Sequence, residues 1–166
     1  IKRELNLIAP LRDKADLVLD TSNTSPNELR LKLGSIFPLA NNRNIQIILQ
    51  SFSFRKGPPS GLDMIFDCRF LKNPNWEDDL KNLNGTDTEV KNYLYKDKSW
   101  ESFNNSLIKM MSTIIPSFER EGKSYLSIGL GCTGGQHRSV FVAEQLFEHL
   151  LDKDYDVKIL HTILQK

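Results

Sequence analysis

The chain has 166 residues, of which 39% are hydrophobic and 26% charged, and its formal net charge is +1. These values are typical of one average globular domain, or of one domain with an additional segment. The balanced charge argues against a general attraction to nucleic acid, so any such contact needs a local basic patch. No apolar run reaches the ~20 residues of a membrane span, and no signal-peptide core is present. With only two cysteines a disulfide framework is excluded, and we expect a cytoplasmic protein.

The first forty residues predict a short α/β segment that ends at a linker. A helix, a short buried strand and a second helix are expected at residues 2–14, 15–20 and 25–33. The second helix begins with a capping box, because Ser25 precedes a proline and Glu28 follows three positions later. Residues 38–44 are rich in Asn and contain a proline, which is typical of a linker. We therefore place a domain boundary there, between residues 1–38 and 43–166.

After the linker, predicted strands alternate with predicted helices. Strands are expected at residues 45–54, 63–70, 125–130 and 156–160, and helices at residues 87–95, 100–118 and from Ser139 onward. Pro116 should kink or end the second of these helices. The alternation predicts an α/β fold with a largely parallel sheet flanked by helices. In such sheets, ligands bind beyond the carboxyl ends of the strands.

A Gly-rich loop at residues 131–138 lies between a predicted strand and a predicted helix. The N–H groups at a helix start have no internal acceptor, and the helix dipole is positive there, so this arrangement suits a phosphate group. Its glycines at positions 131, 134 and 135 allow the backbone to approach a ligand closely. His137 and Arg138 add two cationic side chains. The loop therefore predicts an anion site, although a tight packing turn without a ligand is the alternative.

The same loop has the Cys-x5-Arg spacing of cysteine-dependent phosphatases, from Cys132 to Arg138, with Ser139 next. In those enzymes a thiolate attacks phosphorus while the arginine binds two phosphate oxygens. Two features oppose this alternative: Gly131 stands where those enzymes carry His, and no acid is fixed as the proton donor to the leaving group, for which Asp67 and Asp87 are the candidates. Binding of a phosphate without cleavage is the simpler prediction.

Other polar residues suggest contacts without defining a site. Asp67 and Arg69 lie on one face of the predicted strand at 63–70 and form either a ligand wall or an ordinary ion pair. Small basic groups are expected at the surface, with weak RNA contact as their functional alternative: Arg55, Lys56, Lys158, His161 and Lys166. No GxxxxGK[ST] sequence is present, so the chain has no Walker A loop.

The loop and several other segments resemble the RapZ/YvcJ family of bacterial nucleotide-binding and RNase-adapter proteins. GCTGGQHRSVFVAEQL is similar to the family's GCTGGKHRSVYIAEQL, and FDCRFLKNPNW is similar to FDVRFLPNPHW. SFSFRKGPP resembles SFGFKxGxP, and NLNGTDTEVKNYL resembles MTGLDKPVxxFL. LRDKADLVLDTSNTSPNELR resembles the end of the family's first domain. The resemblance covers nearly the whole chain.

This resemblance implies an architecture and a function. Residues 1–38 would be the remnant of a P-loop domain that binds ATP or GTP, and this chain itself would need no cofactor. Residues 43–166 would be the C-terminal domain, similar in fold to a phosphofructokinase-like half and associated with oligomerisation. That domain would be a non-enzymatic sensor of an amino-sugar phosphate of the glucosamine-6-phosphate class. It would also bind a small regulatory RNA and present that RNA to an endoribonuclease.

The family pattern also implies which residues bind the ligand. The implied phosphate contacts are Thr133, Gly134, Gly135, His137, Arg138 and Ser139, and the implied second wall is Asp67, Arg69 and Asn75. Asn75 replaces a family His, and Gln136 replaces a family Lys, so two cationic side chains are lost. The family's basic tail is also reduced here, which weakens the expectation of RNA binding. A third hypothesis is that the domain mainly oligomerises an upstream P-loop ATPase or GTPase.

Overall fold

The computed structural model describes residues 45–164 without a gap. Before them it describes only scattered residues: Pro10, Lys14, Ala15, 17–22, Thr24, Ser25, Leu29 and Leu33. Distances between Cα atoms divide the chain into two units, residues 1–42 and residues 43–166.

In the first unit, most of the predicted elements lie outside the described residues. The described residues of the expected strand at 15–20 adopt neither helix nor strand, so the strand prediction is wrong for them. Leu17 and Val18 are exposed rather than buried, which removes the basis of that prediction. Leu29 and Leu33 are helical, in agreement with the second helix. The linker at 38–44 lies outside the described residues.

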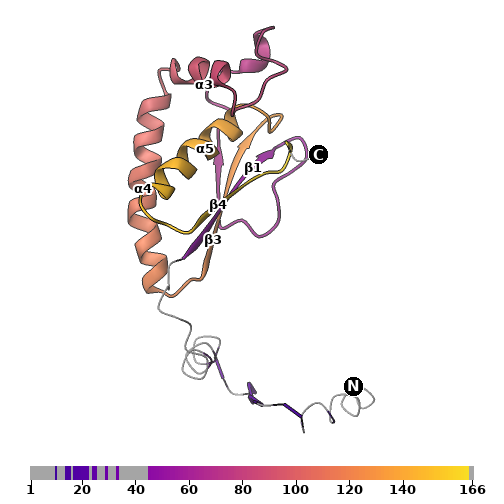
Figure 1. Cartoon of the computed structure of the whole chain (residues 1–166), viewed down its shortest axis with the longest axis vertical. Coiled ribbons are helices and arrows are strands. Elements are labelled where there is room, and N and C mark those ends of the chain that lie inside the picture. The colour runs from indigo at the N-terminus through magenta and orange to yellow at the C-terminus, as the bar shows by residue number, and fades with distance from the viewer. Residues whose placement is uncertain are drawn as a thin grey trace. The chain divides into compact units, whose positions relative to one another are not determined.

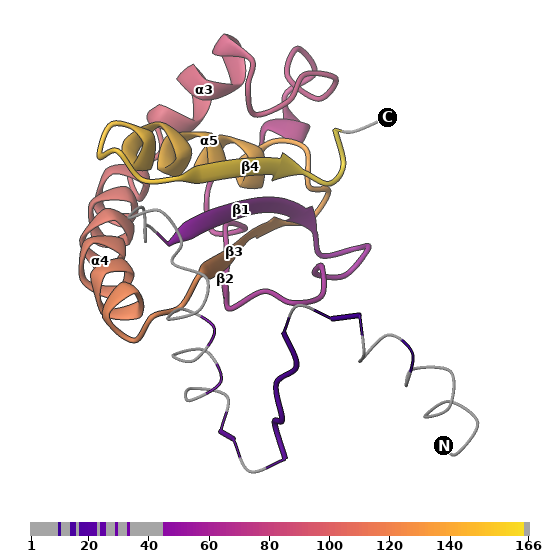
Figure 2. The same cartoon turned by 60° about the horizontal axis from the view of Figure 1, so that its bottom comes forward.

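The second unit is built on a parallel sheet with helices beside it (Figure 1). The sheet has four strands in the order β2-β3-β1-β4 (Figure 2). The strands are β1 (Gln46–Ser53), β2 (Met64–Asp67), β3 (Tyr125–Cys132) and β4 (Val157–His161). The predicted α/β fold with a parallel sheet is therefore confirmed. The likeness to a phosphofructokinase half stays a prediction.

Three α-helices and one short 3-10 helix accompany the sheet. They are η1 (Pro74–Trp76), α3 (Thr88–Tyr95), α4 (Trp100–Arg120) and α5 (Arg138–Leu151). Pro116 lies inside α4, which continues to Arg120, two residues beyond the expected bound at residue 118. The helix therefore does not end at this proline, and the alternative, a kink, stays a prediction. The proline lies only one turn before the end of this 21-residue helix. Proline has no N–H and so removes one helical hydrogen bond, but few further hydrogen bonds of the helix follow that position.

Side chains at successive strand positions lie on opposite faces of the sheet. Helix α5 contacts β1, β3 and β4 on one face (Figure 2). That face carries the main core, in which Leu107 and Met111 of α4 join the strand residues Ile47, Leu49 and Leu130.

The loop after β1, residues 54–63, lies against the other face. A Cβ atom at Gly129 would meet the side chain of Leu62, and one at Gly131 would meet the rings of Phe52 and Phe54. Gly131 is therefore explained by packing. A histidine would not fit at this position, which is the position where cysteine phosphatases carry one.

Two strand ends differ from the predicted bounds, and both affect the site. Strand β3 continues two residues further than expected, so Gly131 and Cys132 belong to the strand. Strand β2 ends at Asp67, three residues before the expected end, and the chain then turns. Both ends lie at the carboxyl edge of the sheet, where α5 begins. Among the described residues, no helix has the length and apolar character needed to cross a bilayer.

Gly85 joins a distant segment to the start of α5 and gives a test of the fold. Its N–H donates to Gln136 O at 2.9 Å, and an added Cβ would overlap His137 O and the backbone N of Phe141. Because backbone cannot move aside as a side chain can, Gly85→Ala should reduce the free energy of unfolding by about 1–3 kcal/mol or more. Chemical denaturation measures this. Gly134→Ala is the matched control, because a Cβ at Gly134 meets no atom within 4 Å; equal losses in both variants would contradict the packing argument.

Candidate functional site

Two adjoining pockets lie where β3 ends and α5 begins. The smaller has a volume of about 90 Å³ and the larger about 570 Å³. Asn73, Thr133 and Arg138 line both. The small pocket is about the size of three water molecules, whereas the large one lies within the usual range for small-molecule sites. A ligand with a compact anionic group and a larger body would match this pair.

The start of α5 supplies backbone donors beside the small pocket. Phe141 N–H donates the first bond of the helix, to His137 O at 2.9 Å. The N–H groups before it are those that helix geometry leaves without an internal acceptor, and the helix dipole is positive at this end. The residues of this turn that line the small pocket are Thr133, Gly134, Gln136, His137 and Arg138. The sequence-based anion site therefore has a pocket of suitable size at the expected place.

The two central glycines of the loop have different roles. Gly134 lines the small pocket, and a Cβ there would meet nothing within 4 Å. Gly135 has φ of 74°, in the left-handed region that favours glycine, and its Cα faces Ile163 and Ser53 N rather than open space. Gly134 is thus placed to face a ligand, whereas Gly135 makes the turn.

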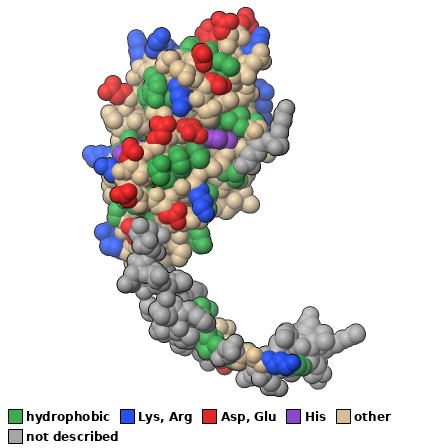
Figure 3. Space-filling view, viewed as in Figure 1, with side chains coloured by type: hydrophobic (Ala, Val, Ile, Leu, Met, Phe, Trp, Pro, Cys, Tyr) green, Lys and Arg blue, Asp and Glu red, His purple; other side chains and the backbone are tan. Residues whose placement is uncertain are grey.

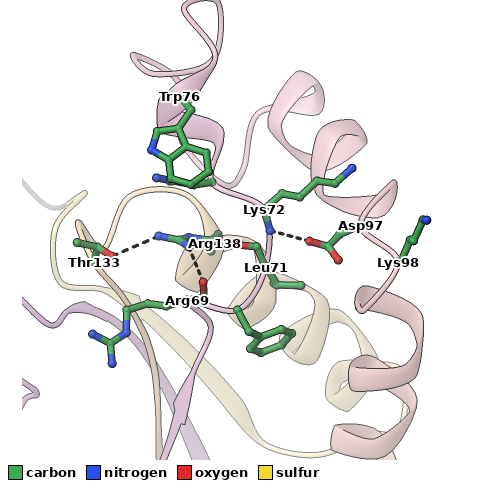
Figure 4. A pocket seen from close by; sticks show the side chains of 10 residues that line it. Arg69, Leu71, Lys72, Trp76, Asp97, Lys98, Thr133 and Arg138 are labelled. Carbon is green, nitrogen blue, oxygen red and sulfur yellow. Dashed lines mark hydrogen bonds between the residues drawn. The ribbon is translucent and has the colours of Figure 1, made fainter.

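The guanidinium of Arg138 is buried and connects both pockets (Figure 4). Its Nη1 donates to Arg69 O at 2.8 Å and to Leu71 O at 3.1 Å, and its Nη2 donates to Thr133 Oγ1 at 3.3 Å. Two of its five N–H groups therefore stabilise the backbone that follows β2. The Nε–H and one Nη2–H are left for other acceptors, so Arg138 acts as a wall of the site as well as a source of positive charge.

The ring of His137 contacts protein backbone on the side of Leu80. Its Nε2 lies 3.1 Å from Leu80 O, and the side chain is only 6% exposed. Because a carbonyl oxygen only accepts, this nitrogen carries the proton. Burial lowers the pKa of His137 below its usual range, which favours the neutral ring. His137 is therefore not the second cation that the sequence suggested at this helix start.

Asp67 and Arg69 form a bidentate ion pair at the end of β2. Arg69 Nε lies 2.9 Å from both carboxylate oxygens, and Nη2 lies 2.6 Å from Oδ2. The hydrogen bonds from Arg69 hold the pKa of Asp67 below its usual range. Arg69 also lies over the ring of Phe54 at 4.3 Å and lines the large pocket. Asp67 lines neither pocket, so of this pair only Arg69 reaches the site.

The large pocket has an aromatic rim. Trp76 of η1 is 82% exposed and stands above Arg138 in Figure 4, so its ring does not pack on the core. Asp97 is the carboxylate of this pocket, and its oxygens accept the N–H groups of Lys72 at 2.6 Å and Ser99 at 2.8 Å. These bonds connect the segment after β2 to the start of α4.

Cys132 lies at the base of the small pocket. Gly135 N–H donates to its Sγ at 3.2 Å, and Ser139 Oγ lies 3.1 Å from the same sulfur. Ser139 is fully buried and does not line either pocket. Its hydroxyl therefore contacts the cysteine rather than the space that a ligand would occupy.

The residues suggested for weak RNA contact are dispersed. Arg55 lines the small pocket, and Lys56 and Lys158 are exposed. His161 has both ring nitrogens occupied, by Ser51 Oγ at 2.8 Å and Glu144 Oε1 at 2.7 Å. Lys166 lies outside the described residues. On the face shown in Figure 3, basic side chains alternate with acidic ones.

Sequence reasoning missed the lining residues Lys72, Asp97 and Lys98. Asn73 and Trp76 also line the large pocket. They belong to the same turn as Asn75, which the family pattern implied as a wall and which lines the small pocket. No pattern connects Asp97 with residues 25 positions away in the chain.

The fold and the site together define a parallel α/β domain with a pocket at a helix start. The chain belongs to the RapZ family, because the family model described as the RapZ C-terminal domain matches residues 45–165.

Three relatives illustrate this membership. A nucleotide-binding protein of Dinoroseobacter shibae is 45% identical over 166 residues. Nucleotide-binding proteins of Cereibacter sphaeroides and Corynebacterium jeikeium are 42% and 36% identical over the same length. All of this chain aligns with each, but it covers only 55–57% of them. The chain thus spans about half the length of the curated relatives it matches.

The buried ring of His137 predicts a pH dependence of stability. Its pKa is lowered in the folded chain, so the unfolded chain takes up the proton first as the pH falls below about 6.5. Stability is therefore complete above that pH and declines below it, by at most about 1.4 kcal/mol per pH unit for one proton. His137→Gln keeps an N–H for Leu80 O but does not titrate. Denaturation at about pH 7.5 and about pH 5.5 should show a smaller loss in the variant than in the parent, and equal losses would refute this assignment.

Proposed function

We propose that this chain is the regulatory domain of a RapZ-like protein and binds a phosphorylated amino sugar of the glucosamine-6-phosphate class. The small pocket at the start of α5 supports this proposal most directly. Backbone N–H groups, Thr133 and Arg138 surround a space that suits a phosphate group. The donors are fixed by secondary structure, so little ordering is needed when an anion enters.

The large pocket would hold the sugar ring. It opens from the small pocket across Asn73, Thr133 and Arg138, so a ring attached to the phosphate would extend into it. Trp76 offers an exposed aromatic face and Asp97 a carboxylate. A hydroxylated ring carrying an ammonium group uses both kinds of contact. The chain would act by binding, without chemistry of its own.

In the longer protein, this domain would follow a P-loop domain that binds ATP or GTP, in keeping with the names of the relatives. A small regulatory RNA and an endoribonuclease are the proposed partners, and the exposed Arg55 and Lys56 would be the RNA contacts. A homo-oligomer is the proposed assembly. Ile65 and Tyr125 support this, because 47% and 60% of these residues remain exposed on the face of the sheet opposite α5.

Ligand binding should raise the melting temperature of the chain in a graded series. Inorganic phosphate should give a small increase, glucosamine-6-phosphate a larger one, and glucosamine none. The reason is that binding requires the contacts to the phosphate group, to which the contacts of the sugar ring add. Gly134→Asp should abolish the increase, since its Cβ would enter the open space of the small pocket with a negative charge. Differential scanning fluorimetry measures the melting temperature of the parent chain with each of the three ligands and the melting temperature of Gly134→Asp.

Ser60→Asp is the matched control, since it adds the same charge on the exposed loop after β1. It should keep the ligand-induced increase. Sugar phosphates that leave the melting temperature of the unsubstituted chain unchanged would refute the proposed function.

A cysteine-dependent phosphatase remains a second candidate because of the contacts of Cys132. Its sulfur is held by Gly135 N–H and Ser139 Oγ, and hydrogen bonds of this kind stabilise a thiolate nucleophile. Two observations oppose it: Gly131 has no room for a larger residue, and two N–H groups of Arg138 are bound to carbonyl oxygens. The first candidate is therefore preferred.

Hydrolysis of p-nitrophenyl phosphate separates the two candidates. A phosphatase would show turnover that Cys132→Ser removes by a factor of about 10² or more, because a hydroxyl is a far poorer nucleophile at neutral pH. We expect no difference between the parent chain and Cys132→Ser. Turnover that is lost in the serine variant would overturn this expectation.

A further inference from the structure

The fold brings the two cysteines of the chain next to each other. They are 64 positions apart in the sequence; Cys132 is the last residue of β3, and Cys68 directly follows the last residue of β2. The last paired residues of β2 and β3 are Asp67 and Gly131, and Cys68 N–H then donates to Gly131 O at 2.8 Å. Cys68 and Cys132 therefore lie opposite each other, one position beyond the end of this parallel ladder.

Their spacing and direction suit a covalent bond. Neighbouring strands lie about 4.8 Å apart, and disulfides join Cα atoms that are about 4.4–6.8 Å apart. Side chains alternate along a strand, so residues in register point to the same face. Phe66 and Leu130 pair two positions earlier and both belong to the core beneath the helices. Both cysteines therefore point to that face.

Both cysteines are buried, Cys132 being 2% and Cys68 0% exposed, but only Cys132 lines a pocket. Cys132 lines the small pocket, and its sulfur accepts an N–H bond from Gly135. Cys68 is fully buried beneath it, and burial raises the pKa of its thiol. A small oxidant entering the pocket would meet Cys132 first, and Cys68 would be reached only through it.

We propose that Cys132 is an oxidation site of the small pocket and that Cys68 resolves the oxidised sulfur as a disulfide. The oxidant is a peroxide of the size of H₂O₂. The Cys132 thiolate attacks one peroxide oxygen, the O–O bond breaks, and the products are a sulfenic acid and hydroxide, which takes the thiol proton to form water. The Cys68 sulfur then attacks the sulfenic sulfur, the S–O bond breaks, and the Cys68 proton leaves with the hydroxyl group as a second water. In total, two thiols are oxidised and one peroxide is reduced.

The disulfide would alter the pocket that the proposed function uses. The Cys132 sulfur would turn towards β2 and lose its contacts with Gly135 N–H and Ser139 Oγ. The turn at Gly134 and Gly135 would then lose the bond that holds it over the sulfur. Dithiol reagents would reverse the change, because thiol–disulfide exchange regenerates both thiols.

Intact-mass analysis of the 166-residue chain after treatment with one equivalent of H₂O₂ tests this proposal. The parent chain should lose about 2 Da, the mass of two hydrogen atoms, and dithiothreitol should restore the original mass. Peptide mapping without reduction should connect Cys68 to Cys132. A parent chain that keeps its mass, or that forms only links between two chains, would overturn the proposal.

Two variants test the order of the steps. Cys68→Val introduces the residue of the family pattern and should fold with unchanged circular dichroism. It should accumulate a dimedone-reactive sulfenic acid on Cys132, because the resolving thiol is absent. Cys132→Ser should leave Cys68 unmodified, since Cys68 is fully buried. Oxidation of Cys68 in Cys132→Ser at the parental rate would contradict the proposed order.

Discussion

The site depends on one buried cation, the guanidinium of Arg138. It stands at the first residue of α5 and binds the carbonyl oxygens of Arg69 and Leu71 and the hydroxyl of Thr133. Two segments that are 67 to 69 positions apart in the sequence therefore meet at a single side chain. A buried acceptor that loses its donor costs about 1–3 kcal/mol, so removal of this residue would release the segment after β2 as well as remove a charge.

This contact gives the two pockets a common wall. The segment that Arg138 holds continues into Asn73 and η1, which form one side of both pockets, and Asp97 holds the same segment through Lys72 N–H. An anion that binds beside Arg138 thus contacts the residue that also sets the shape of the larger pocket. Under the proposed function, recognition of a phosphate group and of the body attached to it would therefore be coupled through one side chain and the segment that it holds.

The sequence predicted the sheet well, because alternating hydrophobicity is a local signal, and it placed the glycine loop at the helix start where the structure has a pocket. The ion pair of Asp67 and Arg69 was one of its two alternatives, since the two residues are neighbours on one strand face. It did not predict that His137 would face Leu80, because this orientation depends on a segment far along the chain. Asp97 and Lys72 were missed for the same reason. The glycines show the limit clearly: Gly134 and Gly135 look alike in sequence, yet one faces open space and the other makes the turn.

The two tryptophans of the chain stand in opposite environments. Trp100 is 6% exposed, in an aromatic cluster with Phe141 and Tyr95, whereas Trp76 is 82% exposed at the rim of the larger pocket. Indole emission moves to longer wavelength as its surroundings become more polar, so Trp76 should emit at longer wavelength than Trp100. The pocket therefore carries an intrinsic optical label, and the core carries a second one that serves as an internal reference.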